Sequence, residues 1–203
     1  MYLLNLSGGI DSANCAYHLL KQGKRLLIHH CEYHNRMQRG HQEKTATLAI
    51  VSWLRSQGLS KFEYIESKIE VSDFRYKLYD IELLGFLSAG LFRMKRNRIT
   101  NIVISESLDD FEQSDFHTRH QNRMDLINVM CKDYGDVNII FPNKEKSRTD
   151  IIKDTPTDIL KLCWYCRRPQ KGLPCKQSDM CKTCIKTIPV LIEMGLVEKE
   201  LSQ

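Results

Sequence analysis

Short apolar runs alternate along the chain with longer stretches in which apolar residues recur at helical spacing. The runs have the length and apolar content of buried strands, and they lie at residues 2–6, 24–31, 62–67, 101–105 and 137–141. The amphipathic stretches follow in turn, at residues 11–23, 40–58, 79–97, 115–135 and 147–154. Several of them end at a glycine, which is typical of the C-terminal cap of a helix. The pattern therefore predicts five strand–helix pairs in succession.

This alternation predicts a doubly wound α/β fold, with a mostly parallel sheet and helices on both faces. We place the α/β domain at residues 1–160. The remainder, residues 161–203, is rich in cysteine and predicts a small separate module that ends in a helix. In a doubly wound sheet, ligands bind beyond the carboxyl ends of the strands. The residues that follow each apolar run are therefore the first candidates for a site.

The overall composition is that of an ordinary globular protein, with 42% hydrophobic and 27% charged residues among 203. No apolar run approaches the length of a membrane span, and the N-terminus lacks the pattern of a signal peptide. We therefore expect a cytoplasmic protein that does not bind a membrane. The net charge of +5 is mild, and the densest basic stretch, residues 90–98, holds one aromatic residue. No stable complex with nucleic acid is expected.

The sequence Ser-Gly-Gly-Ile-Asp-Ser at residues 7–12 joins the first predicted strand to the first predicted helix. Gly8 and Gly9 allow backbone N–H groups to approach an oxyanion closely, and Ser7 and Ser12 add hydroxyl donors. The N-terminus of the helix adds the positive end of its dipole. Together these groups predict a cradle for phosphate or pyrophosphate. The sequence is neither a Walker A loop nor a GxGxxG turn.

The pattern Ser-Gly-Gly-x-Asp-Ser is similar to the pyrophosphate loop (PP-loop) of the ATP pyrophosphatases, which adenylate a substrate and release pyrophosphate. We therefore predict that ATP is bound by the loop and its neighbours, which are Leu6, Ser7, Gly8, Gly9, Ile10, Asp11, Ser12 and Ala13. Asp11 is an acid within an anion site, and this is favourable if its carboxylate helps to hold Mg²⁺ beside the phosphates. The alternative interpretation is a Gly-Gly turn that Asp11 and Ser12 cap.

Five of the eight cysteines fall within residues 163–184, in the sequence CWYCRRPQKGLPCKQSDMCKTC. Zinc takes four thiolates in a tetrahedral array, and such a dense group of cysteines favours a zinc site over disulfides or unliganded thiols. Five cysteines compete for four places. Spacing alone favours the two CxxC pairs, which are Cys163 with Cys166 and Cys181 with Cys184, and it leaves Cys175 free.

Taken as a whole, the chain resembles the 7-cyano-7-deazaguanine synthase family of queuosine-type deazapurine biosynthesis. Besides the loop, the resemblance rests on residues 32–46, 101–111, 146–153 and 162–166, and it runs nearly end to end. It implies an adenine nucleotide alpha hydrolase-like fold. Because the family has a Trp shortly before its first zinc-binding cysteine and a second cysteine nine positions later, the resemblance implies zinc ligands at Cys166, Cys175, Cys181 and Cys184. Cys163 then stands where the family has a Thr.

The resemblance also implies a reaction, in which 7-carboxy-7-deazaguanine, ammonia and ATP give 7-cyano-7-deazaguanine through an acyl-adenylate and an amide. In such a reaction the protein mainly positions the reactants and neutralises phosphate charge. The residues expected to take part are Asp11, Ser12, Arg39, His41, Asp109, Asp110 and Arg148. His41 is chosen over His29, His30 and His34 because it falls near the family's Arg-His pair. The acid pair follows a strand and is expected to orient ammonia or the amine of the base.

Three departures from the family pattern lie near the expected site of the deazapurine. They are VSDFRYKLYD at residues 71–80, DDFEQSDFHTR at 109–119 and the lengthened CKQSDMC at 175–181. They leave open a related enzyme that stops at the amide or uses another amine. An RNA-modifying enzyme and a non-catalytic zinc-ribbon module are further alternatives. The oligomeric state also stays open, with a homodimer among the options.

Overall fold

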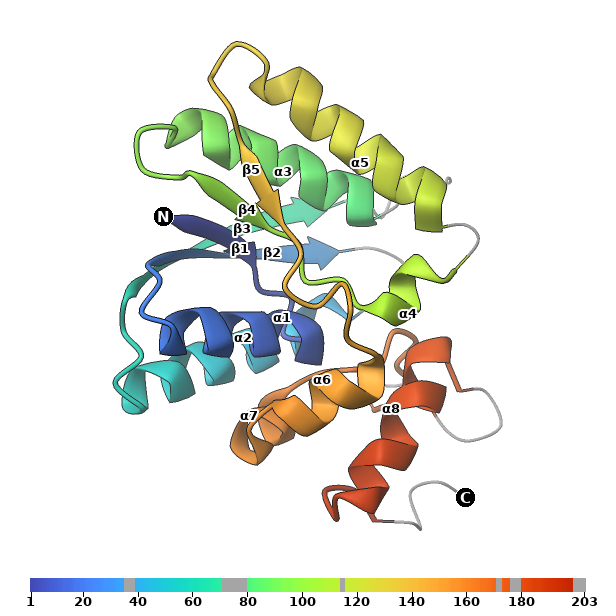
Figure 1. The fold of residues 1–203 in the computed structure, drawn as a ribbon. Helices are drawn as coiled ribbons and strands as arrows, with labels where there is room; N and C mark the ends of the chain where they lie inside the picture. The colour runs from blue at the N-terminus through green and yellow to red at the C-terminus, as the bar shows by residue number, and fades with distance from the viewer. Residues whose placement is uncertain (35–38, 71–79, 114–115, 171–172, 176–179, 199–203) are drawn as a thin grey trace.

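The computed structural model of the protein describes residues 1–34, 39–70, 80–113, 116–170, 173–175 and 180–198 (Figure 1). Its centre is a five-stranded sheet whose neighbouring strands are parallel and lie in the order β3-β2-β1-β4-β5. The strands are β1 (Tyr2–Asn5), β2 (Leu26–His34), β3 (Phe62–Glu70), β4 (Asn101–Val103) and β5 (Asn138–Ile140). The predicted α/β fold with a parallel sheet is confirmed.

Helices cover both faces of this sheet (Figure 1). One face carries α1 (Ile10–Lys21) and α2 (Gly40–Ser56), and the other carries α3 (Asp80–Met94) and α5 (Phe116–Cys131). The remaining helices are α4 (Leu108–Phe111), α6 (Arg148–Asp154), α7 (Thr157–Leu162) and α8 (Lys182–Glu193). The five predicted strand–helix pairs are present. Helices α4 and α7 are additional, because they are too short to produce a periodic pattern.

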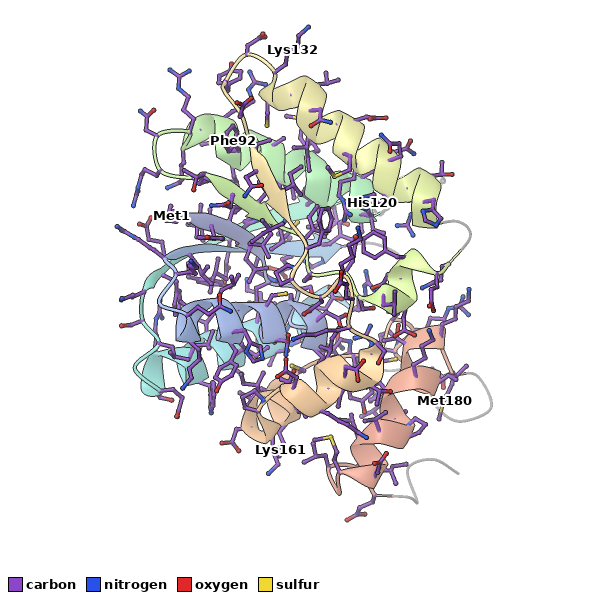
Figure 2. The ribbon with its side chains drawn as sticks, viewed as in Figure 1. Met1, Phe92, His120, Lys132, Lys161 and Met180 are labelled. Atoms are coloured by element: carbon purple, nitrogen blue, oxygen red, sulfur yellow. The ribbon has the colours of Figure 1, made fainter. Side chains whose placement is uncertain are left out.

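The sheet is buried on both faces because successive strand residues point to opposite sides. In β1, Leu4 packs with Ala16 of α1 and Ile50 of α2, whereas Leu3 packs with Phe92 of α3. Both leucines are fully buried. Figure 2 shows side chains filling the space between the sheet and its helices, with Phe92 labelled on α3. Burial on both sides explains why each strand is a continuous apolar run in the sequence.

The strand order changes direction at β1, with β2 and β3 on one side and β4 and β5 on the other. The segment after β1 leads into α1 on one face of the sheet, and the segment after β4 leads through α4 to α5 on the other. The two segments therefore separate at the carboxyl ends of their strands. Such a topological switch point is where doubly wound sheets bind ligands.

The C-terminal helix packs against the α/β domain. Val190 and Leu191 of α8 share a buried cluster with Ile10 of α1 and Ile151 of α6. The predicted boundary between residues 160 and 161 falls within α7, and the division into two domains stays a prediction. Within the described part of the chain, no helix combines the length and the apolar character that crossing a bilayer needs.

Candidate functional site

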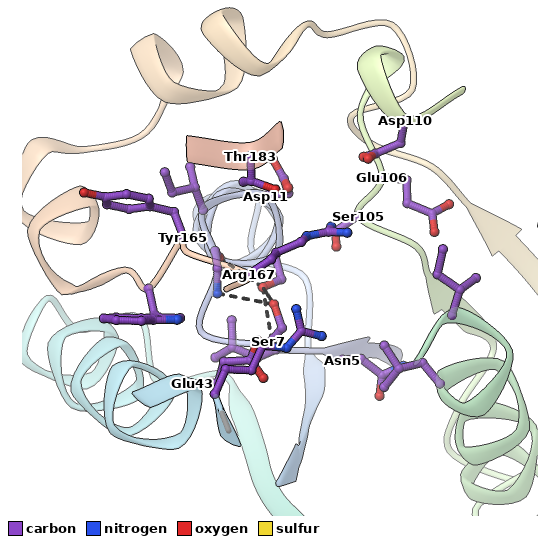
Figure 3. Close-up of a pocket in the computed structure, with 18 of the residues that line it drawn as sticks. Asn5, Ser7, Asp11, Glu43, Ser105, Glu106, Asp110, Tyr165, Arg167 and Thr183 are labelled. Carbon is purple, nitrogen blue, oxygen red and sulfur yellow. Dashed lines mark hydrogen bonds and ion pairs between the residues drawn. The ribbon is translucent and has the colours of Figure 1, made fainter. Parts of the chain in front are cut away.

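A cavity of about 230 Å³ lies at the switch point, at the carboxyl ends of β1, β2 and β4 (Figure 3). Its walls come from the segment after β1, the start of α2, α3, the segment after β4 and the cysteine-rich segment. Four acids and four arginines line it, namely Asp11, Glu43, Glu106, Asp110, Arg39, Arg119, Arg148 and Arg167. A wall with this mixture of charges suits a charged ligand rather than an apolar one.

Gly8 gives the turn at residues 7–12 its shape. Its φ of 79° lies in the left-handed region that favours glycine. A Cβ at this position would also lie 2.5 Å from the carbonyl oxygen of Glu43 in α2. The carbonyl oxygen of Gly8 accepts a hydrogen bond of 2.9 Å from the backbone N–H of Trp164. The turn therefore fits closely between α2 and the cysteine-rich segment.

Two serine hydroxyls hold the same turn together. The Ser12 hydroxyl donates to the carbonyl oxygen of Gly9 at 3.1 Å and accepts from the backbone N–H of Ser7 at 3.2 Å. The Ser7 hydroxyl accepts from the backbone N–H of Gly9 at 3.3 Å. Gly9 is the N-cap of α1, and among the described residues no side chain caps the first turn. The helix N-terminus therefore presents N–H groups that an anion can accept from.

Most of the predicted nucleotide-binding residues reach the cavity, and those that line it are Leu6, Ser7, Gly9, Ile10, Asp11 and Ser12. Gly8 and Ala13 do not line it. Gly8 directs its carbonyl group to Trp164, and the Ala13 N–H donates to the carbonyl oxygen of Gly9 inside the helix. These two residues shape the turn instead of facing a ligand.

Asp11 lies in the first turn of α1 and lines the cavity (Figure 3). Burial raises the pKa of its carboxyl group and Asp110 adds to the rise, although the charge of Arg148 opposes it. Arg148 donates from Nη1 to Asp11 Oδ1 at 2.7 Å. A partly buried carboxylate with a raised pKa gains from a further positive charge, so Asp11 fits the predicted role beside Mg²⁺.

The segment after β4 is held by charged side chains. Glu106 lines the cavity and pairs with Arg123 of α5 through two hydrogen bonds, of which the longer is 2.6 Å. Burial raises the pKa of Glu106, but the hydrogen bonds from Arg123 and the charges of Arg123 and His120 outweigh it, so that the pKa is lowered. Glu106 is not among the residues predicted from the sequence. Its place directly after the apolar run at residues 101–105 is the signal that identifies it.

Asp109 and Asp110 follow in α4 and have different surroundings. Asp110 lines the cavity, and its Oδ2 accepts from the backbone N–H and the hydroxyl of Ser107 at 3.0 and 2.9 Å. Asp109 does not line the cavity. Its Oδ1 accepts from Lys186 of α8, and its Oδ2 accepts from the backbone N–H of Arg148. Asp109 therefore ties three helices together beside the cavity, whereas Asp110 faces it.

The structure brings Arg39 and Arg148 to the cavity but not His41. Arg39 Nε lies 3.2 Å from Glu43 Oε1, and both residues line the cavity at the start of α2. His41 is an exposed residue of α2, and the histidine that lines the cavity is His29 of β2. His41 is chosen because it lies near the family's Arg-His pair in the sequence, but in the structure it does not line the cavity.

His29 belongs to a polar chain that crosses the floor of the cavity from α3 to β3. Its Nδ1 bonds to Asn5 Oδ1 and its Nε2 to Ser67 Oγ, both at 2.8 Å. The side-chain amide of Asn5 donates to Ser88 Oγ at 2.6 Å. Burial, with His30 adding to it, lowers the pKa of His29 to about 4, so the ring is neutral at neutral pH. This uncharged chain fixes the side chain of Asn5 at the carboxyl end of β1.

The cysteine-rich segment brings four sulfurs together. The Sγ atoms of Cys166, Cys175, Cys181 and Cys184 all lie within 4.8 Å of one another, and all four residues are buried. Cys163 instead packs against the apolar clusters of the α/β domain and of α6 and α8. Backbone N–H groups of Cys175 and Cys181 donate to Cys166 and Cys175 Sγ, each at 3.2 Å. The cluster fits a four-thiolate zinc site, and it is the set that the family resemblance implies.

Parts of the predicted site lie outside the described residues. They are 35–38 near Arg39, 71–79 and 114–115 in the segments that depart from the family, and 171–172 and 176–179 between the cysteines. The described remainder of these segments includes Arg119, which lines the cavity with its Nε 3.8 Å from Glu82 Oε1. Arg119 and Arg167 are cavity residues that the sequence analysis does not identify.

Comparison with known proteins adds little to this description. No protein-family model matches the chain, and no curated protein matches it. Among solved structures, the chain is similar to NMN synthetase from Francisella tularensis, with a TM-score of 0.45 and 17% sequence identity over 99% of this chain and 74% of the other. The α/β architecture rests on the strand order described above.

Proposed function

We propose that the chain is an ATP-dependent enzyme that activates a carboxylate by adenylation, as the ATP pyrophosphatases do. The observation that carries the proposal is the turn at residues 7–12, which opens into a charged cavity at the switch point of the sheet. The N–H groups at the start of α1 and the Ser7 hydroxyl meet there. Such a group of donors at a helix N-terminus suits a polyphosphate.

The proposed reaction begins with activation because a carboxylate is a poor electrophile. A carboxylate oxygen attacks the α-phosphorus of ATP, pyrophosphate leaves, and an acyl-adenylate results. Ammonia then attacks the acyl carbon and displaces AMP with loss of a proton, which gives the amide. Attack of the amide oxygen on a second ATP releases pyrophosphate again, and loss of AMP and the amide protons gives the nitrile.

The described residues divide these tasks. The turn and the N-terminus of α1 hold phosphate charge, and Arg148 neutralises more of it beside Asp11. Mg²⁺, which Asp11 would help to hold, supplies further positive charge beside the phosphates. Arg39 and Asp110, which come from separate walls of the cavity, orient the carboxylate and the attacking amine.

We propose 7-carboxy-7-deazaguanine and ammonia as the substrates and 7-cyano-7-deazaguanine as the product. The support is the resemblance of five sequence segments to the 7-cyano-7-deazaguanine synthase family, together with the four clustered cysteines. The second candidate is an enzyme that stops at the amide or joins the activated carboxylate to another amine. The departures at residues 71–80 and 109–119 favour it, since they lie near the expected site of the deazapurine.

One incubation tests both candidates. The protein is given 7-carboxy-7-deazaguanine, ATP, Mg²⁺ and ammonium, and the heterocycle is analysed by mass spectrometry while pyrophosphate release is followed. We expect the nitrile, with pyrophosphate release that depends on the carboxylate and on Mg²⁺. The amide alone, or a conjugate when another amine is supplied, would favour the second candidate. No pyrophosphate release would contradict adenylation of this substrate by either candidate.

We propose zinc as the metal of the four-cysteine cluster. A closed four-thiolate zinc site supplies folding energy rather than chemistry. Cys175→Ser and Cys163→Ser form a matched pair, because only Cys175 belongs to the cluster. We expect Cys175→Ser to lose zinc and to melt at a lower temperature, whereas Cys163→Ser keeps its zinc, as measured by elemental mass spectrometry and thermal unfolding. Equal zinc content in the two variants would contradict this ligand set.

A further inference from the structure

The four arginines that line the cavity differ in how their charges are balanced. Three of them lie 3.2, 3.8 and 2.7 Å from a carboxylate oxygen, in the pairs Arg39 with Glu43, Arg119 with Glu82 and Arg148 with Asp11. Arg167 forms no side-chain hydrogen bond or ion pair with any residue in the described part of the chain. It is therefore the arginine of the cavity wall whose guanidinium can take a ligand without giving up a described partner.

Arg167 lines the same cavity as Ser7 and Asp11 (Figure 3). Its side chain is exposed, so it enters the cavity from the solvent side. Burial raises the pKa of Asp11, and the charge of Arg167 opposes the rise together with that of Arg148. The guanidinium of Arg167 therefore acts on the first turn of α1, where the N–H groups of the turn also point.

The backbone of Arg167 is held by the cysteine cluster. The residue follows Cys166, a member of the cluster, directly in the sequence. Close by in the same segment, the backbone N–H of Trp164 donates to the carbonyl oxygen of Gly8 at 2.9 Å, and its indole N–H donates to the carbonyl oxygen of Cys166 at 2.8 Å. This short segment thus contacts the cluster and the turn together, and it sets Arg167 against the turn.

We propose that Arg167 is an anion-binding residue whose guanidinium binds the polyphosphate of the nucleotide. The inference rests on the proposed function, and it makes the cysteine-rich segment a second wall of the nucleotide site. A guanidinium presents parallel N–H donors to a phosphate, and such charge-assisted hydrogen bonds are stronger than neutral ones. The cysteine cluster then does more than support folding, because it fixes the position of Arg167 relative to the turn.

The test compares Arg167→Gln with Arg168→Gln. The two arginines are adjacent and exposed, but only Arg167 lines the cavity. Calorimetric titrations of the zinc-loaded protein with Mg²⁺ use three probes, which are α,β-methylene-ATP, pyrophosphate and AMP. We expect Arg167→Gln to lower the affinity for α,β-methylene-ATP and for pyrophosphate by about tenfold or more, and to change the affinity for AMP by less than about twofold. We expect Arg168→Gln to change none of the three, and Arg167→Lys to recover part of the affinity that Arg167→Gln loses.

Several results would overturn the inference. Pyrophosphate affinity that is unchanged in Arg167→Gln would do so, as would an equal loss in Arg168→Gln, because only the net charge would then matter. An equal loss for AMP would place the contact away from the polyphosphate and would also overturn it. If the unmodified protein binds none of the probes, the proposed function fails instead. Equal zinc content and melting temperature in all the proteins exclude misfolding as the cause.

Discussion

The two segments that border the switch point are stabilised in different ways. The turn after β1, residues 7–12, is held by backbone geometry and by hydroxyl groups that bond within the turn itself, as Ser7 and Ser12 do. All of these contacts join residues within five positions of each other in the sequence. The backbone of the turn is therefore largely preorganised by its own residues, and it presents N–H and O–H donors to the cavity beside the carboxylate of Asp11.

The segment after β4, residues 105–110, is held by charges whose partners lie far away in the sequence. Glu106 bonds to Arg123 of α5, and Asp109 bonds to Lys186 of α8. This segment presents carboxylate acceptors to the cavity. The contrast matches the proposed reaction, in which donors are needed for the phosphates and acceptors are needed for the amine. We therefore expect variants of the turn to change nucleotide binding, and variants of the charged segment to change mainly stability.

The largest effect is expected from Gly8→Ala. A Cβ here would meet the carbonyl oxygen of Glu43 at 2.5 Å, in a residue whose φ of 79° already disfavours a side chain. We expect the free energy of unfolding to fall by about 3 kcal/mol and nucleotide binding to disappear in calorimetry. Gly58→Ala is the control, because its φ of 72° is similar but no described atom lies within 4 Å of its Cβ.

The control isolates the close approach from the backbone strain. We expect Gly58→Ala to cost about 1 kcal/mol, which is the usual cost of a left-handed conformation for a residue with a side chain. An equal loss of stability at the two positions would show that the contact with Glu43 contributes nothing. Unchanged nucleotide binding in Gly8→Ala would contradict the phosphate-binding role of the turn.

Glu106→Gln tests the charged segment and should have a smaller effect. The substitution leaves Arg123, a residue that is 5% exposed, without its charged partner. We expect the free energy of unfolding to fall by about 2 kcal/mol in urea titrations, because a glutamine oxygen can still accept one of the two hydrogen bonds. Pyrophosphate affinity should stay unchanged, which distinguishes this segment from the turn. Glu112→Gln, at an exposed position after α4, should change stability by less than about 0.5 kcal/mol.

The same contrast explains how much the sequence could predict. The strand–helix alternation and the turn depend on contacts between neighbouring residues, and the structure contains both. The position of Glu106 after a predicted strand points to the site, but no local pattern indicates its partner Arg123. The pair of Arg119 with Glu82 likewise joins two different helices. His41 illustrates the same limit, since its place in the sequence does not determine which way it faces on α2.

The cysteines show where spacing alone is insufficient. Two CxxC pairs favour Cys163 over Cys175, yet the structure turns Cys163 into the apolar packing and brings Cys175 to the other three sulfurs. Cys163 follows α7 directly, so the direction of its side chain is set by how that helix packs. Only the family resemblance, through the position of Trp164, indicates the set that the structure brings together.

Asp11 links the two segments electrostatically, and its effect should depend on pH. Burial raises its pKa in the folded protein above the ordinary 3.8, so the folded chain holds this proton more tightly than the unfolded chain does. The resulting stabilisation is complete below the ordinary pKa and is lost as the pH rises through the raised pKa. The free energy of unfolding of the unmodified protein, minus that of Asp11→Asn, should therefore fall as the pH rises above the ordinary pKa of 3.8.

Urea titrations of the two proteins across this pH range provide the measurement. Saturating Mg²⁺ and α,β-methylene-ATP should reduce the fall, because a bound cation favours the ionised carboxylate. A difference that grows with rising pH would mean that the ion pair with Arg148 outweighs burial and holds the pKa of Asp11 below 3.8. That result would remove the argument that Asp11 gains from a further cation.

The smallest effect is expected where the charged segment meets α8. Lys186 is 47% exposed at its side chain and donates to Asp109, so solvent screens much of the attraction. We expect Lys186→Gln to lower the free energy of unfolding by about 0.5 kcal/mol, and high salt to remove the difference. Lys182→Gln, exposed on the same helix, is the control and should have no effect. If Lys186→Gln lost as much stability as Glu106→Gln, solvent exposure would not weaken the ion pair between Lys186 and Asp109. The segment after β4 would then be held equally firmly by its pair with α5 and by its pair with α8.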